Sequence, residues 1–390
     1  MQSKISPWPS FSEDEAKAVS KVLLSNKVNY WTGSECKKFE NEFAHWSQAK
    51  YAIAVSNGTV AIEIALKALG ISHGDEVIVT PRSFIASVSS VITVGAKPIF
   101  SDVDLNSGNI CAHEIGKKIT KRTKAIICVH LAGYPCEMDE IMELANNRNI
   151  FVIEDCAQAH GAKYKNQPVG SIGHIGCFSF CQDKIMTTGG EGGMITTNNE
   201  IFWRKMWSLK DHGKTIHSVY EENHPPGYRW LHEEFGSNYR MTEMQAAIGR
   251  IQLKKMKLWN NLRTKNADSL DLLFSNFNSL IRLPVLHKNI THGWYKYYVY
   301  LINDGLKDHW SRDRISDEIN ALGTPCFSGS CSEIYLEKAF ENKYRPKDRL
   351  KNAKELGENT LMFLIHPTIT HDELSNHSRN IEKVLNMAKK

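Results

Sequence analysis

The segment CFSFCQDKIMTTGGEGG, residues Cys177–Gly193, carries the most information about the fold. It opens as an apolar run typical of a buried strand, continues through a polar turn that presents Lys184, and ends in a glycine-rich loop. Upstream, the apolar run Phe151–Asp155 (FVIED) ends in two carboxylic acids. Polar groups that follow buried strands in this way are typical of a ligand site at one edge of an α/β sheet.

The lysine and the acid together suit one cofactor, pyridoxal 5'-phosphate (PLP). A lysine amine can form a Schiff base with an aldehyde. A carboxylate beside a pyridine nitrogen keeps that nitrogen protonated, so that the ring withdraws electrons. We therefore interpret Lys184 as the tether of PLP and Asp155 as its electronic partner. The competing interpretations are a solvated surface lysine and a helix-capping aspartate, and each explains only one of the two residues.

Length and charge narrow the class of protein. A chain of 390 residues favours one large and one small domain. The net charge of +5 is small, and Lys and Arg are scattered among acids, so we expect no nucleic-acid partner. No apolar run reaches the ~18–20 residues that span a bilayer, and residues 1–10 lack the apolar stretch of a signal peptide. We therefore expect a cytoplasmic protein without membrane association.

Nine cysteines are an odd number and lack the spacing of a disulfide framework, which predicts reduced thiols. The pair Cys177 and Cys181 has a spacing that is weak evidence for a metal site, and we expect no metal.

Short apolar runs alternate with amphipathic runs through the first two-thirds of the chain. This alternation predicts an α/β fold with a mostly parallel sheet and helices on both faces. The alternation weakens near residue 270, so we expect a large domain over residues 1–265 and a smaller α+β domain over residues 266–390. Predicted strands are 52–55, 76–80, 97–103, 125–130, 151–154, 175–180, 194–196 and 295–301, and predicted helices are 59–69, 85–94, 138–146, 241–266, 312–322 and 372–389.

Four further features suit a PLP site, and each has a plain structural alternative. The turn 56–59 (SNGT) precedes a predicted helix, where backbone N–H groups bind phosphate, although such residues also cap helices. Phe84 follows a predicted strand and could stack on a flat ring or simply pack in the core. Gln158 lies about one turn after Asp155 and could donate to a ring oxygen. Asn238 carries donors for an anion, but it precedes a helix that could serve only packing.

Taken in order and spacing, four motifs resemble the DegT/DnrJ/StrS family of sugar aminotransferases. They are residues 56–59 (SNGT), 154–161 (EDCAQAHG), 179–184 (SFCQDK) with its glycine loop, and 238–249 (NYRMTEMQAAIG). The resemblance extends from about residue 5 to 385 and is weakest after residue 270. It implies the aspartate aminotransferase architecture, fold type I of PLP-dependent transferases. Such a fold has a large domain with a mostly parallel, mixed seven-stranded sheet and a smaller C-terminal domain.

The resemblance also implies roles for eight residues. Lys184 carries the cofactor and moves protons, Asp155 pairs with the pyridine nitrogen, and Gln158 contacts the ring hydroxyl oxygen. Phe84 stacks on the ring. The phosphate is held by Gly58, Thr59 and Ser179, and by Asn238 from a partner subunit, which makes a homodimer with shared active sites necessary for activity.

The implied reaction moves an amino group from L-glutamate to C3 or C4 of a nucleotide-linked keto sugar, with the cofactor alternating between PLP and pyridoxamine 5'-phosphate (PMP). Such amino sugars enter surface polysaccharides such as lipopolysaccharide O-antigen. One family branch has histidine in place of the lysine and catalyses a dehydration, which Lys184 disfavours. The alternative is a regulatory or non-transaminating PLP-binding protein on the same scaffold. A nicotinamide oxidoreductase is disfavoured because the first strand lacks a Gly-x-Gly-x-x-Gly turn.

The segment 324–335 (TPCFSGSCSEIY) departs from the tyrosine- and histidine-rich pattern that is commoner at this place in the family. We expect it to hold the information about the sugar. The nucleotide, the sugar and the aminated carbon all remain open at this point.

Overall fold

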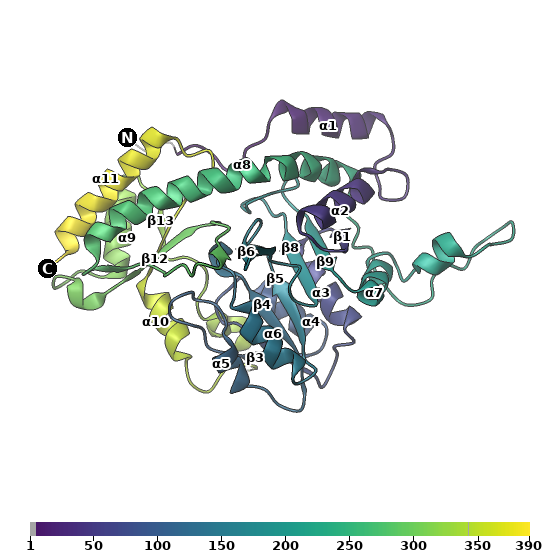
Figure 1. The fold of residues 1–390 in the computed structure, drawn as a ribbon, viewed down its shortest axis with the longest axis horizontal. Helices are drawn as coiled ribbons and strands as arrows, with labels where there is room; N and C mark the ends of the chain where they lie inside the picture. Colours follow the sequence, from purple (N-terminus) through teal and green to yellow (C-terminus); the bar gives the residue numbers. More distant parts are fainter. Residues whose placement is uncertain (1–4, 342) are drawn as a thin grey trace.

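The computed structural model describes residues 5–341 and 343–390 and contains two bodies that share one long helix, α8 (Glu243–Phe274). Figure 1 shows α8 running along the top of both bodies, with the C-terminal helix α11 (His371–Ala388) beside its far end. Within the described residues, no helix has both the length and the apolar character needed to cross a bilayer.

The large body is built on a seven-stranded sheet of order β1-β9-β8-β5-β4-β2-β3. Strands β2, β3, β4, β5 and β8 are mutually parallel, and β9 is antiparallel to both of its neighbours. This mostly parallel, mixed sheet confirms the predicted fold class. The strands are β1 (Tyr51–Val55), β2 (Glu76–Val79), β3 (Lys97–Phe100), β4 (Thr123–Val129), β5 (Phe151–Asp155), β8 (Ile175–Ser179) and β9 (Gly193–Thr197).

The central strands are apolar on both faces because helices cover both faces. In β4, for example, Ile127 packs in a cluster with helices α3 (Gly58–Ala68) and α4 (Ala86–Thr93). Its neighbour Ile126 packs in another cluster with α5 (Ala112–Gly116) and α6 (Met138–Asn146). The sheet therefore forms the middle layer, and its strand ends are the open positions at which polar residues can gather.

The small body is an antiparallel sheet of order β10-β12-β14-β13 with its own hydrophobic core. The N-terminal half of α8 packs in the large core through residues such as Trp259, and its C-terminal half packs in the small core through Leu270 and Phe274. We propose that the two domains divide near residues 265 and 266. The strands of the small sheet are β10 (Ile281–Arg282), β12 (Tyr297–Leu301), β13 (Cys326–Phe327) and β14 (Thr360–Phe363).

Hydrogen bonds between distant segments join the two bodies, and two of them illustrate the pattern. Arg82, in the turn after β2, is buried and donates to Tyr300 Oη (3.3 Å) and Thr360 Oγ1 (2.8 Å) of the small body. At the N-terminus, Ser6 donates its backbone N–H to Glu373 of α11 (2.7 Å), so the first described residues lie against the small body.

The remaining elements complete the two bodies. The helices are α1 (Glu13–Leu24), α2 (Glu35–Trp46), α7 (Glu200–Lys210), α9 (Arg312–Ala321) and α10 (Lys351–Asn359). A small sheet holds β6 (Lys163–Tyr164), β7 (Gln167–Pro168) and β11 (Ile290–Thr291). The short 3-10 and π turns are η1 (Leu131–Gly133), η2 (His217–Glu221), η3 (Ser275–Phe277), η4 (Asn303–Gly305), η5 (Ile334–Leu336) and η6 (Lys338–Phe340).

Residues 211–240, between α7 and α8, form an arm that projects from the large body (Figure 1). The arm carries η2, and four of its large hydrophobic side chains are exposed. They are Tyr220, Tyr228, Trp230 and Phe235.

Candidate active site

The carboxyl ends of the parallel strands meet along one edge of the large sheet, and a cavity of about 1080 Å³ opens there between the two bodies. Seven of the eight predicted cofactor residues line it. They are Gly58, Thr59, Phe84, Asp155, Gln158, Ser179 and Lys184.

Asp155 is the last residue of β5 and is buried. Ser87 Oγ donates to its Oδ2 (2.7 Å), and the backbone N–H of Ala157 donates to its Oδ1 (3.1 Å). Burial raises the pKa of Asp155, while these hydrogen bonds and the charge of Lys184 oppose the rise. A buried carboxylate of this kind is well placed to accept a hydrogen bond from a protonated ring nitrogen.

Lys184 lies in the turn after β8 and is largely buried, with 15% of its side chain exposed. Its Nζ lies 3.6 Å from Asp183 Oδ1 and 5.1 Å from the centre of the Tyr295 ring. The indole N–H of Trp8 donates to the backbone oxygen of Lys184 (2.9 Å). The backbone of the lysine is therefore held in place, while its amine faces the cavity.

The N-terminus of α3 forms one corner of the cavity. The first N–H groups of a helix lack intrahelical partners, so those at Gly58 and Thr59 suit a phosphate. Asn57 caps the helix by accepting a backbone N–H (2.9 Å). A Cβ on Gly58 would lie 2.7 Å from that of Ser179, and a Cβ on Gly193 would lie 2.5 Å from the backbone oxygen of Asn57. The corner is therefore closed by close backbone contacts that only glycine permits.

Gln158 and Phe84 complete the ring-binding part of the cavity. Gln158 Oε1 accepts the backbone N–H of Ala132 (2.7 Å), which leaves the amide N–H groups of Gln158 to donate to a ring oxygen. The Phe84 side chain is 67% exposed although it lies in a cavity. An aromatic ring exposed inside a cavity can stack on a flat ligand.

Asn238 does not line the cavity of its own chain. It is exposed at the base of the arm, beside Asp211. Within its own chain, Asn238 therefore lies outside the candidate cofactor site.

Several residues of the site were not predicted as site residues. Ser87 lies in a predicted helix, and Tyr295 and Lys296 lie in a predicted strand. A lysine inside an otherwise aromatic strand was the signal that could have revealed Lys296. The segment that departs from the family pattern also lines the cavity, through Phe327, Gly329, Ser330, Cys331 and Ile334.

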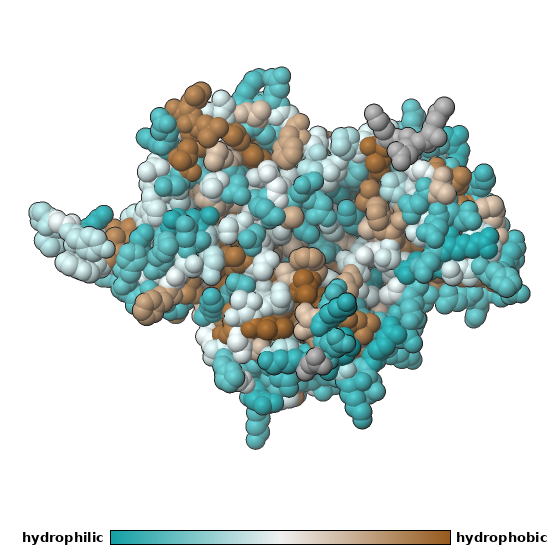
Figure 2. Space-filling model, turned by 180° about the vertical axis from the view of Figure 1, so that it is seen from behind, coloured by the Kyte–Doolittle hydropathy of each residue, from teal (hydrophilic) through white to brown (hydrophobic). Residues whose placement is uncertain are grey.

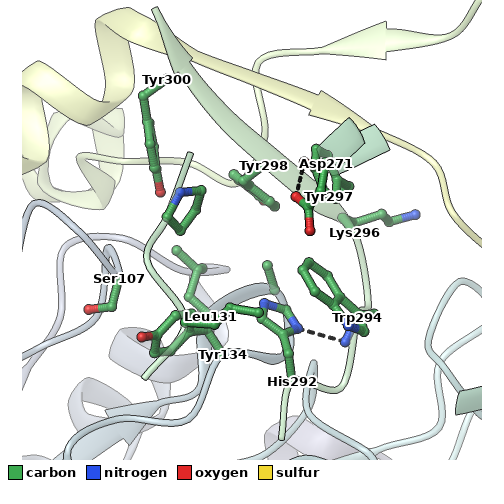
Figure 3. A pocket seen from close by; sticks show the side chains of 13 residues that line it. Ser107, Leu131, Tyr134, Asp271, His292, Trp294, Lys296, Tyr297, Tyr298 and Tyr300 are labelled. Carbon is green, nitrogen blue, oxygen red and sulfur yellow. Dashed lines mark hydrogen bonds between the residues drawn. The ribbon is translucent and has the colours of Figure 1, made fainter. Parts of the chain in front are cut away.

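A smaller cavity of about 40 Å³ adjoins the first, and Lys296 and Tyr298 line both. Figure 3 shows that it is surrounded by rings such as Tyr134 and Trp294, and that the amine of Lys296 points away from it. Its volume suits a few water molecules rather than a substrate. The amine of Lys296 is therefore not directed into the smaller cavity, and Lys296 also lines the larger one.

One buried cluster has ligand types that a metal could use: His130, Glu154 and Cys156. Glu154 instead accepts backbone N–H groups from residues 170, 172 and 173, and its Oε2 lies 3.0 Å from His130 Nε2. The other ring nitrogen of His130 accepts the N–H of Cys136 (3.0 Å). These hydrogen bonds fix the loop after β7 and account for both side chains. Each of the nine cysteines, all within the described residues, is a free thiol.

The donor set fits PLP: a lysine amine, a buried acid, a free side-chain amide, an exposed aromatic ring and a helix N-terminus face one cavity. When bound, PLP supplies an electron sink for the carbon that loses its proton. Lys184 would tether the cofactor and then carry that proton, Asp155 would hold the proton on the ring nitrogen, and the start of α3 would hold the phosphate. Fold and site together define a PLP-dependent aminotransferase.

More narrowly, the chain belongs to the DegT/DnrJ/EryC1/StrS aminotransferase family, whose profile matches residues 9–381. GDP-perosamine synthase of Escherichia coli O157:H7 is 43% identical over 94% of each chain. The dTDP-3-amino-3,4,6-trideoxy-alpha-D-glucose transaminase of Streptomyces venezuelae is 30% identical over 90% of this chain and 86% of that one. The X-ray structure of an aminotransferase from Psychrobacter cryohalolentis is 60% identical, with a TM-score of 0.97 over 98% of this chain and 99% of that one.

Proposed function

We propose that this aminotransferase moves the amino group of L-glutamate to C3 or C4 of a nucleotide-linked keto sugar in the cytoplasm. The product would supply an amino sugar for a surface polysaccharide such as lipopolysaccharide O-antigen. The observation that carries the proposal is the size of the cavity, about 1080 Å³. That volume slightly exceeds the usual range of about 300–1,000 Å³ for small-molecule sites, and it suits PLP together with a substrate much larger than an amino acid.

A second wall of the cavity supports the same proposal. It includes Phe327, Gly329, Ser330, Cys331 and Ile334, together with Met362 and Leu364, all of them distant from Asp155 in sequence. Ser330 donates its N–H to Tyr298 Oη (2.9 Å), and the two hydroxyl oxygens lie 3.0 Å apart. Hydroxyl and apolar groups side by side suit a deoxy sugar that carries few hydroxyls.

A panel of keto sugars tests the proposal. The PMP form of the enzyme is mixed with GDP-, dTDP- and UDP-linked 3-keto and 4-keto sugars, and the return of PLP absorbance is followed. We expect one nucleotide and one carbon to react fastest, with the amino sugar identified by mass spectrometry. If no nucleotide sugar restores the PLP band, the regulatory alternative gains support.

We also propose that the enzyme acts as a homodimer with shared active sites. The arm supports this proposal because its exposed aromatic residues, such as Trp230 and Phe235, are typical of an interface, and because it leads directly to Asn238. Leu23 and Leu24 are also exposed at the end of α1, and Figure 2 shows apolar patches across the face seen from behind.

Mixing two impaired variants tests the sharing of sites. In a dimer of Lys184→Ala with Asn238→Ala chains, one site has both mutations and the other has neither. If Asn238 acts in the partner's site, random exchange of subunits should restore about one quarter of the wild-type activity. Each variant alone serves as the control. Unchanged low activity in exchanged mixtures would mean that Asn238 acts within its own chain.

A further inference from the structure

Lys296 is the second amine of the active-site cavity. It lies just before β12, half-buried in the wall of the small body. Its Nζ is 4.8 Å from the centre of the Tyr295 ring, and the Nζ of Lys184 is 5.1 Å from the same centre. The two amines therefore lie within about 10 Å of each other, around one aromatic ring.

The second feature of Lys296 is its lack of an ion-pair partner in the part of the chain that the structure describes. Among the described residues, Lys296 forms no ion pair, and the nearby carboxylate of Asp183 is engaged with Lys184 and the hydroxyl of Tyr295. Burial lowers the pKa of Lys296 to about 8, and the positive charges of Arg263 and Lys184 act in the same direction, against the charge of Asp183. A partly buried cation without a partner is costly. An anion that enters the cavity would relieve that cost.

The position of Lys296 is fixed relative to the cofactor residues. Ala132 donates its N–H to Gln158 (2.7 Å), and its carbonyl oxygen accepts the N–H of Tyr295 (2.9 Å). Ala132 adopts a left-handed conformation with a φ of 55°, which an alanine adopts only at a cost. One strained residue thus links the side chain that contacts the cofactor ring to the backbone beside Lys296. The backbone beside Lys296 is therefore held in a fixed position relative to Gln158.

We propose that Lys296 binds the α-carboxylate of the amino-acid donor. This inference rests on the proposed function, because it names the residue that recognises the first substrate. The donor nitrogen must reach the position of the Lys184 amine. The α-carboxylate is attached to the carbon that bears this nitrogen, so it is the anion of the donor that stays nearest to that position. The side-chain carboxylate of glutamate is free to extend toward the rest of the cavity.

The test measures the donor half-reaction alone, as the loss of PLP absorbance in the holoenzyme without any sugar. Three donors are compared: L-glutamate, its α-amide (L-isoglutamine) and its γ-amide (L-glutamine). In the wild type, we expect the α-amide to raise the half-saturating concentration by about 10- to 100-fold. Lys296→Met should raise the half-saturating concentration of glutamate by a similar factor. In this variant, the half-saturating concentrations of glutamate and its α-amide should be nearly equal. Lys296→Arg should retain most of the preference for glutamate.

Lys307→Met is the matched control, because Lys307 lies in the same body, is exposed, and donates to a backbone oxygen (3.0 Å) outside the cavity. The inference is overturned if Lys296→Met leaves the value for glutamate unchanged, or if it raises the values for glutamate and its α-amide equally. It is also overturned if Lys296→Met removes the preference for glutamate over its γ-amide instead of the preference over its α-amide. A wild-type enzyme that converts no amino donor would overturn the proposed function as well.

Discussion

The Lys184→Ala enzyme should lose transaminase activity by about 10⁴-fold or more, because one side chain serves as both the cofactor tether and the proton carrier. Borohydride should fix the cofactor covalently to the wild type and not to the variant. Rates are measured with saturating donor and acceptor, and attachment is measured by mass spectrometry of the labelled peptide.

Two controls separate chemistry from folding. The variant should still bind PMP, since the helix terminus, Asp155 and Gln158 are unchanged. Lys117→Ala removes an exposed lysine whose one ion pair among the described residues is with Glu114, and the variant should retain full activity. A Lys184→Ala enzyme that transaminates at the wild-type rate would show that another lysine carries the cofactor.

The second large effect is expected at Asp155. Asp155→Asn keeps the shape of the side chain but removes the negative charge that holds the ring-nitrogen proton. We expect a loss of activity of about 10²-fold or more, comparable to the removal of one preorganised electrostatic group. The absorbance of bound PLP should shift as well, because the ring nitrogen is no longer held protonated. Normal activity and an unchanged spectrum would contradict the role of Asp155.

The same variant has a distinct effect on stability. Burial raises the pKa of Asp155, so the ionised carboxylate destabilises the cofactor-free fold at pH values above the folded pKa. Without cofactor, Asp155→Asn should therefore unfold at a slightly higher temperature than the wild type near neutral pH. This advantage should shrink as the pH falls through the folded pKa, where wild-type Asp155 takes up a proton. Thermal unfolding across pH values measures both trends.

Much of the large domain could be predicted because the local pattern of apolar and polar residues indicates its strands and helices. The predicted helix 138–146 coincides with α6, and predicted strand ends near residues 154 and 180 place Asp155 and Ser179 at the correct edge. Helix α8 begins near its predicted start because Thr242 and Gln245 form a capping box. It continues eight residues beyond the predicted end, because Leu270 and Phe274 pack in the second core, a tertiary effect that local pattern does not contain.

The rest of the site depends on contacts between distant segments. Ser87 supports Asp155 from a position 68 residues away, and Tyr295 reaches Asp183 across 112 residues. No local spacing encodes either pair. The arm is a further case. Tyr228 packs against Trp230 and Tyr220 against Trp207, yet these arm residues stay exposed, so they follow no periodic pattern of burial. The reactive residues were predictable because strand ends determine their position. The residues that hydrogen-bond to them were not predictable, because they come from distant segments.

The donor half-reaction of the wild-type holoenzyme is the sharpest test of whether this protein is a transaminase. The PLP-loaded protein is mixed with L-glutamate in the absence of sugar, and 2-oxoglutarate is quantified against bound cofactor. We expect about one 2-oxoglutarate per bound PLP, with conversion of the cofactor to PMP. Borohydride-reducible PLP on Lys184 that no amino donor converts to PMP would contradict it.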